Sequence, residues 1–145
     1  MDLKQIYREI VNEHNLYPSH KKEIENPTIT LEGQNPTCGD DIVLQLVVGD
    51  DGVIKDAAFT GSGCAVSQAS TDIMIDQIIG LDKESALKRV AAFMGMVHGT
   101  ISEEELEELE EAASLKDVSH MPARAKCATL AWHTLEKMIG GEINE

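Results

Sequence analysis

The sequence predicts an α+β fold, in which a small three-stranded antiparallel sheet is covered on one face by helices. Two apolar, β-branched runs, 42–48 and 53–60, are separated by the hairpin signal Gly49-Asp50-Asp51-Gly52. A shorter run of the same kind precedes them at 28–32. From residue 64 onward, apolar residues recur at helical spacing instead. The order of strands followed by helices predicts one helical layer packed on one sheet.

The first half of the chain supplies the strands and one helix. Residues 3–14 carry apolar side chains at helical spacing, with Asp2 as a candidate N-cap. Residues 15–27 contain two prolines and are typical of a surface loop. Gly33 is expected to end the first strand, and Gly61-Ser62-Gly63 the third. The run 42–48 is apolar on both faces, which predicts the central strand.

The second half is expected to be helical throughout. Cys64 opens the first of these helices, and Pro122 suits the first turn of the last. The helix between them that starts near Asp82 is expected to present Leu87, Val90, Ala91 and Met94 to the core. The next one is strongly acidic, with seven glutamates between Glu103 and Glu111, which is typical of a solvated face. The predicted helices span 64–80, 82–97, 101–113 and 122–140.

Composition narrows the functional classes. A chain of 145 residues that is 42% apolar predicts one domain over residues 1–145. A formal charge of −14 repels phosphate backbones, so no nucleic-acid partner is expected. No apolar run could span a bilayer and the start does not resemble a secretory signal, so we expect a cytoplasmic protein without a membrane partner. In that reducing compartment, three cysteines favour metal or thiol chemistry over disulfides.

The three cysteines all lie beside turns or helix starts rather than within apolar stripes. Cys38 lies in the turn Asn35–Asp41, two residues before Asp40, and Cys64 and Cys127 lie at or near predicted helix starts, where backbone N–H groups favour a thiolate. Three sulfurs and one carboxylate can fill the tetrahedral shell of Zn²⁺. Each cysteine alone could equally be a small buried hydrophobe, and there is no C-x-x-C pair. Asp41 is as well placed as Asp40 to supply the oxygen.

The charged neighbours of the cysteines have two interpretations. Arg124 and Lys126 flank Cys127, and either they are ordinary surface charge or they offset the negative charge of three thiolates and a carboxylate around zinc. The histidines are expected to be mostly exposed polar residues. His133 is six residues past Cys127 and therefore faces a different side of the helix.

With these segments placed, the chain resembles the SufU/IscU family of iron–sulfur cluster assembly proteins, also called NifU N-terminal-like. The resemblance covers nearly the whole length. It is carried by the motifs Asn35-Pro36-Thr37-Cys38-Gly39-Asp40, Gly61-Ser62-Gly63-Cys64 with Ser67-Gln68-Ala69-Ser70, and Pro122-Ala123-Arg124-Ala125-Lys126-Cys127-Ala128. It implies an α+β fold of the kind predicted above. It also implies that the metal or cluster ligands are Cys38, Asp40, Cys64 and Cys127.

Within the family, the chain is more similar to the SufU branch. Scaffold-type members have a histidine directly before the third cysteine, where this chain has Lys126. SufU-type members have an added segment before that cysteine, and the acidic stretch 101–113 is such a segment here. They also have the sequence Arg-x-Lys-Cys at that cysteine, as Arg124-Ala125-Lys126-Cys127 is in this chain. The family often has Asn-Pro-Arg-Asn in the N-terminal loop, whereas this chain has Leu16-Tyr17-Pro18-Ser19-His20. The role of that loop is therefore open.

The SufU resemblance implies a zinc-dependent sulfurtransferase that accepts persulfide sulfur from a pyridoxal-phosphate-dependent cysteine desulfurase of the SufS type. A Suf scaffold complex could follow it. Cys38 is expected to be the catalytic, sulfur-accepting thiol, because its Pro/Gly-flanked turn gives access. One alternative is an IscU-like scaffold that holds an iron–sulfur cluster on the same ligands. Another is a zinc-stabilised interaction module, in which the four ligands stay closed.

Overall fold

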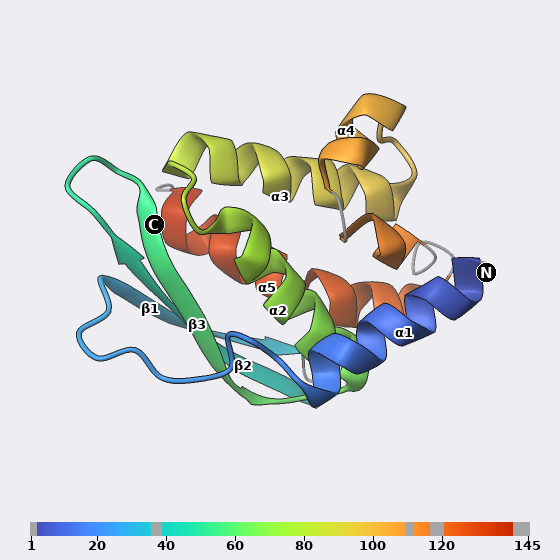
Figure 1. Ribbon diagram of the computed structural model, residues 1–145, viewed down its shortest axis with the longest axis horizontal. Coiled ribbons are helices and arrows are strands. Elements are labelled where there is room, and N and C mark those ends of the chain that lie inside the picture. Colours follow the sequence, from blue (N-terminus) through green and yellow to red (C-terminus); the bar gives the residue numbers. More distant parts are fainter. Residues whose placement is uncertain (1–2, 36–38, 110–111, 117–120, 141–145) are drawn as a thin grey trace.

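The computed structural model describes residues 3–35, 39–109, 112–116 and 121–140. Helices gather on one face of a three-stranded antiparallel sheet of order β1-β2-β3, which confirms the predicted α+β fold (Figure 1). The proposed cap Asp2 lies outside the described residues. The elements are α1 (Leu3–Leu16), β1 (Ile29–Asn35), β2 (Asp40–Val48), β3 (Ile54–Ser62), α2 (Ala65–Ile78), α3 (Lys83–His98), α4 (Glu103–Glu108) and α5 (Pro122–Gly140).

The central strand β2 anchors the sheet to the helices. Its alternate residues Ile42, Leu44 and Leu46 are fully buried, as a strand covered by helices on one face requires. The residues between them are partly exposed on the other face. There the segment between α1 and β1 crosses the sheet, and the backbone N–H of Ile24 donates to Gln45 Oε1 at 2.8 Å. The predicted central position of this strand is confirmed.

Of the two glycine signals expected to end strands, only one does so: β3 ends at Ser62, within Gly61-Ser62-Gly63, as predicted, whereas β1 runs past Gly33. Gly33 pairs with Ile42 in the β1–β2 ladder, so β1 continues past it to Asn35. A methyl group on Gly33 would collide with Thr134 of α5. Gly61 likewise pairs within β3, opposite Ile42. Gly33 therefore marks the place where a helix crosses the sheet closely, and not the end of a strand.

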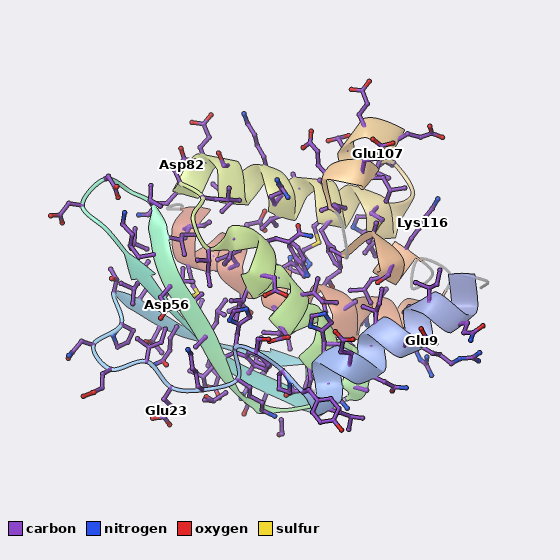
Figure 2. All side chains as sticks on the ribbon, in the orientation of Figure 1. Glu9, Glu23, Asp56, Asp82, Glu107 and Lys116 are labelled. Atoms are coloured by element: carbon purple, nitrogen blue, oxygen red, sulfur yellow. The ribbon has the colours of Figure 1, made fainter. Side chains whose placement is uncertain are left out.

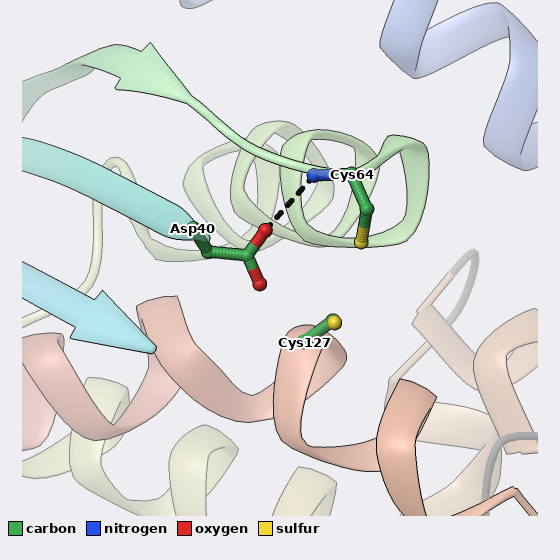
Figure 3. Close-up of side chains that lie close together, drawn as sticks. All are labelled: Asp40, Cys64 and Cys127. Carbon is green, nitrogen blue, oxygen red and sulfur yellow. Dashed lines mark hydrogen bonds between the residues drawn. The ribbon is translucent and has the colours of Figure 1, made fainter. Parts of the chain in front are cut away.

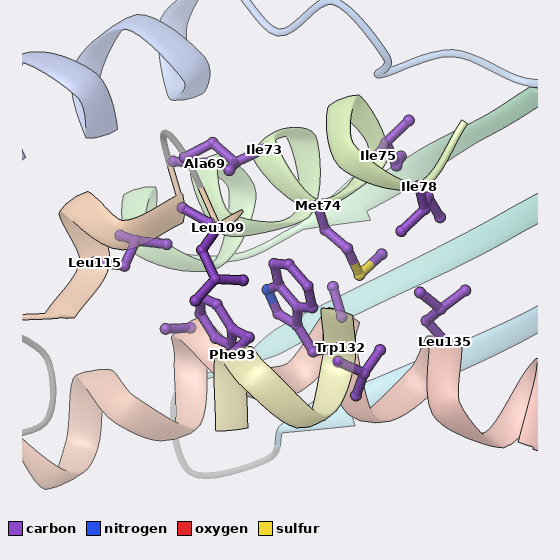
Figure 4. Close-up of a cluster of buried hydrophobic side chains, with 14 of the residues drawn as sticks. Ala69, Ile73, Met74, Ile75, Ile78, Phe93, Leu109, Leu115, Trp132 and Leu135 are labelled. Atoms are coloured by element: carbon purple, nitrogen blue, oxygen red, sulfur yellow. The ribbon is translucent and has the colours of Figure 1, made fainter. Parts of the chain in front are cut away.

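The core lies between the sheet and the helices and continues between α2, α3 and α5. Helix α2 is buried along most of its length, and Trp132 of α5 stacks on Phe93 of α3 with ring centroids 4.1 Å apart (Figure 4). Val90 is buried as predicted, but Ala91 is exposed and the expected inner face of this helix is wrong there. Phe93, which stacks on Trp132, lies on the buried face of the helix. Its buried residues are Ala86, Val90, Ala92, Phe93, Met96 and Val97.

The acidic helix α4 is shorter than the predicted 101–113. It begins at a capping box, in which Glu105 N–H donates to Ser102 Oγ at 3.2 Å and Ser102 N–H donates to the Glu105 carboxylate. It ends at Glu108, and Leu109 is fully buried. Acidic side chains here and elsewhere, such as Glu107, project away from the ribbon (Figure 2). In the described part of the chain, no helix is long and apolar enough to cross a membrane.

Candidate metal centre

Three elements bring one carboxylate and two thiols together. Asp40 is the first residue of β2, Cys64 is the N-cap of α2, and Cys127 lies on α5. Their ligand atoms all lie within 4.8 Å of one another, and the three side chains point into the same space (Figure 3). The structure therefore assembles three of the four predicted ligands. Cys38 lies outside the described residues, and its role stays a prediction.

Asp40 is a buried carboxylate with one oxygen held and the other open to the site. Its residue is only 2% exposed, and the Cys64 backbone N–H donates to Oδ1 at 2.9 Å. Oδ2 is buried and has no hydrogen-bond partner among the described residues. A buried carboxylate oxygen left unpaired is costly, whereas a metal ion would satisfy it. The donor set, one carboxylate and two thiols, fits zinc.

Gly63 allows this carboxylate to approach. A Cβ atom at Gly63 would lie 2.5 Å from Asp40 Oδ1, which is too close for a real contact, and 3.1 Å from its Cγ, which is tighter than most real contacts. The residue before the N-cap of α2 therefore has no side chain, and Asp40 packs directly against its backbone. The close approach of Asp40 therefore explains why the second glycine of the Gly61-Ser62-Gly63-Cys64 motif has to be a glycine.

The choice between Asp40 and Asp41 follows from the strand. Successive side chains of β2 point to opposite faces, so only one of the two can face the cysteines. Asp41 lies on the side of Glu32 of β1. Its hydrogen bond and negative charge raise the pKa of the Glu32 carboxyl above its ordinary value. Of the two aspartates, Asp40 is thus the one whose carboxylate faces the two cysteines.

The two described cysteines are held in different ways. Cys64 caps α2 as predicted, and its Sγ accepts a hydrogen bond from the Ser67 backbone N–H at 3.4 Å. Cys127 lies beyond the first turn of α5, which begins at Pro122, so the prediction that it lies near a helix start is only roughly right. It is 4% exposed, whereas Cys64 is partly exposed.

A buried hydrogen-bond chain fixes α5 beside Cys127. Ser70 of α2 donates from Oγ to the Ala128 carbonyl at 2.6 Å, and Trp132 Nε1 donates to the same Oγ at 3.0 Å. Both bonds join α2 to α5. Because Ala128 directly follows Cys127, these two hydrogen bonds set the distance between the two helices that carry the thiols.

A pocket of about 410 Å³ opens beside the two thiols. Arg124 is exposed and lines it, whereas Lys126 is exposed but is not among the lining residues. Arg8 of α1 adds a second cation that the sequence interpretation missed. No local pattern could have indicated it, because α1 meets this site only through the tertiary fold. The lining residues are Tyr7, Arg8, Val11, Asn12, Cys64, Ala65, Val66, Ala123, Arg124 and Cys127.

The histidines divide into two groups. His133 is exposed while Cys127 is buried, as the helical spacing predicts. The expectation of mostly exposed histidines is wrong for His14, which is 7% exposed and lies 2.6 Å from the Asp72 carboxylate. His20 is also partly buried and contacts Asp76. These contacts lie outside the cysteine site.

The chain has close relatives in sequence and structure. It is 38% identical to the zinc-dependent sulfurtransferase SufU of Bacillus subtilis, over 97% of this chain and 94% of that one. It is 39% identical to the iron–sulfur cluster assembly scaffold protein IscU of Streptococcus pyogenes, over 98% and 87% of the two chains. The crystal structure of SufU from Fervidobacterium islandicum AW-1 superposes with a TM-score of 0.86 at 37% identity, covering 93% of this chain and 97% of that one.

A protein-family match covers most of the chain. Residues 6–140 match the family described as NifU-like N terminal domain. This match takes in all three elements that carry Asp40, Cys64 and Cys127. The chain therefore belongs to the family of NifU-like N-terminal domains, in which the SufU and IscU proteins named above are its relatives.

Proposed function

We propose that this chain is a zinc-dependent sulfurtransferase of iron–sulfur cluster assembly, which accepts persulfide sulfur from a cysteine desulfurase. The observation that carries the proposal is the unpaired, buried Oδ2 of Asp40 facing Cys64 and Cys127. The identity shared with the Bacillus subtilis sulfurtransferase supports it, as does the scaffold relative in naming the same process. The proposed partner is a pyridoxal-phosphate-dependent desulfurase of the SufS type, with a Suf scaffold complex downstream.

Asp40, Cys64 and Cys127 would hold the zinc ion, with Cys38 as the fourth ligand. Zinc, when bound, would keep its sulfur ligands as thiolates at neutral pH. The Cys64 backbone N–H holds the Asp40 carboxylate through Oδ1, which leaves Oδ2 for the metal. Carboxylate oxygen is a harder ligand than thiolate sulfur, so Asp40 is the ligand best suited to exchange.

Cys38 is the proposed sulfur acceptor. Cys127 is 4% exposed, and Cys64 is engaged as the cap of α2, so both are better suited to hold than to attack. In the proposed step, the Cys38 thiolate attacks the terminal sulfur of the desulfurase persulfide. That sulfur–sulfur bond breaks, a new one forms on Cys38, and the desulfurase cysteine leaves as a thiolate. The exchange needs no external oxidant or reductant.

The pocket beside the thiols is suited to the incoming persulfide. It lies against Cys64 and Cys127, and Arg8 and Arg124 give it two cationic side chains. Those cations favour the negative charge of thiolates and of an ionised persulfide. Lys126 is exposed next to Cys127 and adds positive charge near the site, although it does not line the pocket.

The second candidate is a scaffold that holds an iron–sulfur cluster on the same ligands. The relatives from Streptococcus pyogenes and Thermotoga maritima, 39% and 35% identical, are both named as IscU scaffold proteins. Thiolates and a carboxylate could also ligate a cluster. The two functions therefore differ in what occupies the site.

One experiment distinguishes the two. The chain is purified without oxygen and its metals and absorption spectrum are recorded. It is then incubated with a cysteine desulfurase and cysteine. The sulfurtransferase proposal expects a colourless protein with bound zinc that increases desulfurase turnover. A brown chromophore with iron and sulfide, together with no increase in turnover, would establish the scaffold function instead.

A further inference from the structure

A second cluster of metal-ligating side chains lies away from the cysteines. Its centre is Asp72, a fully buried residue of α2. His14 Nδ1, from the last turn of α1, lies 2.6 Å from Asp72 Oδ2, and the His20 backbone N–H donates to Oδ1 at 2.9 Å. A carboxylate removed from water is stable only where cations or hydrogen-bond donors compensate its charge. Here both of its oxygens are engaged.

Asp76 adds a second carboxylate one turn further along α2. Residues four apart lie on the same face of a helix, so Asp72 and Asp76 are neighbours. The ligand atoms of His14, Asp72 and Asp76 all lie within 4.8 Å of one another. His20 Nε2 in turn lies 2.6 Å from Asp76 Oδ1. Two imidazoles and two carboxylates therefore converge from α1, the segment after it, and α2.

This cluster is separate from the cysteine site. Asp72 follows Cys64 by more than two helical turns, roughly 12 Å along α2. The two clusters share no residue. The donors also differ in kind, because nitrogen and oxygen replace sulfur here. A ligand of the second cluster would not compete with the first for side chains.

We propose that His14, Asp72 and Asp76 form a second metal site, which binds a divalent transition ion such as Zn²⁺, Co²⁺ or Fe²⁺. Neutral imidazoles combined with carboxylates suit these ions, whereas Mg²⁺ and Ca²⁺ prefer oxygen alone. Two carboxylates balance the charge of a divalent cation. His20, already on Asp76, supplies either a fourth ligand or the hydrogen bond that orients that carboxylate.

The site would fasten the N-terminal part of the chain to the core. His14 lies in the last turn of α1 and contacts Asp72 of α2. His20 lies in the segment that follows and contacts both Asp72 and Asp76. A bound ion would join these segments directly. Binding should therefore raise the melting temperature and slow amide exchange in α1, because a ligand of the folded state alone stabilises it.

The test is a metal titration of the full chain whose cysteine site has first been filled with one equivalent of Zn²⁺. Co²⁺ is then added and counted by equilibrium dialysis. A thiolate ligand gives Co²⁺ an intense near-ultraviolet charge-transfer band, and a site of nitrogen and oxygen does not. The proposal expects a second bound equivalent without that band. The variant Asp76→Asn should bind this equivalent about tenfold or more weakly.

The control is Glu136→Gln on α5, where an exposed carboxylate lies 3.9 Å from His133. This substitution removes a carboxylate that lies beside a histidine but has no buried aspartate next to it in the described part of the chain. The Glu136→Gln variant should therefore still bind the Co²⁺ ion at the second site. Asp76 is about half exposed, so the test variant should fold. The proposal would be overturned if the unmodified chain bound no Co²⁺ beyond its one equivalent of Zn²⁺, or if Asp76→Asn bound as much Co²⁺ as the unmodified chain. Failure here leaves sulfur transfer unaffected, because that activity is measured separately.

Discussion

Asp40 and Asp41 are neighbours in the chain, and their side chains point to opposite faces of β2. Asp40 is buried and faces two thiols, and its Oδ2 has no hydrogen-bond partner among the described residues. Asp41 lies across the strand with Glu32, whose pKa it raises. The alternation of a β-strand alone separates a proposed metal ligand from a carboxylate on the other face. This pair is therefore a natural test of the site.

Asp40→Asn is expected to weaken zinc binding about tenfold or more, because the amide lacks the charge that a metal ligand supplies. Zinc affinity is measured by competition with a chromophoric chelator. Asp41→Asn is the matched control and should bind zinc as the unmodified chain does. Equal losses in the two variants would show that overall negative charge, rather than coordination by Asp40, sets the affinity.

Ser70 is the residue that joins the two thiol-bearing helices. Ser70→Ala leaves the buried Trp132 Nε1 without its acceptor and should lower the free energy of unfolding by about 1–3 kcal/mol. Urea unfolding followed by fluorescence reports it directly, because Trp132 is the sole tryptophan. Ser19→Ala, at an exposed residue, should change stability by less than about 0.5 kcal/mol. Indistinguishable unfolding curves for Ser70→Ala and the unmodified chain would contradict this role.

At the scale of elements, the crossing of α5 over β1 depends on Gly33. Gly33→Ala should destabilise the fold by about 1–3 kcal/mol, because the added methyl meets Thr134. Thr134→Ala removes the atom in conflict and should recover part of the loss when combined with Gly33→Ala. Denaturant unfolding of the two single variants and the double variant gives the coupling. Simple additivity of the two single losses would mean that the two residues do not meet.

Elements with a strong local signal could be predicted from the sequence. Local residues alone indicate the strand β2 by its apolar run, the start of α2 by Cys64 and the start of α5 by Pro122. The role of Gly33 could not be predicted, because a glycine can end a strand or admit a crossing helix, and only the tertiary partner decides. The buried face of α3 could not be predicted in full, because Phe93 stacks on Trp132, far along the chain.

At the scale of the whole molecule, the grouping of the candidate ligands could be predicted in part, but their surroundings could not. Cysteines beside turns and helix starts, together with the family motifs, pointed to Cys38, Asp40, Cys64 and Cys127, and the structure brings the last three together. Their burial, and the side chains that share their pocket, depend on packing between distant segments. Arg8 reaches the pocket from α1. His14 is buried against expectation, because the sequence does not show that Asp72 will be buried beside it.

A bound metal should stabilise the whole molecule. Asp40, Cys64 and Cys127 belong to β2, the start of α2 and α5, so one ion would join the sheet to both helices. Because the ligands are assembled only in the folded state, metal binding contributes to folding. Removal of zinc with a chelator should lower the melting temperature, and the shift should be smaller for Asp40→Asn. Superimposable melting curves with and without zinc, in a verified metal-free sample, would refute this coupling.

The most direct test of the proposed function is the location of the transferred sulfur. The chain is incubated with a cysteine desulfurase and cysteine, and the persulfide is mapped by mass spectrometry of alkylated peptides. We expect one added sulfur on Cys38. The variant Cys38→Ala should form no stable persulfide and give no gain in desulfurase turnover, although it should still hold part of its zinc through Asp40, Cys64 and Cys127. Persulfide mainly on Cys64 or Cys127, with Cys38→Ala still active, would contradict it.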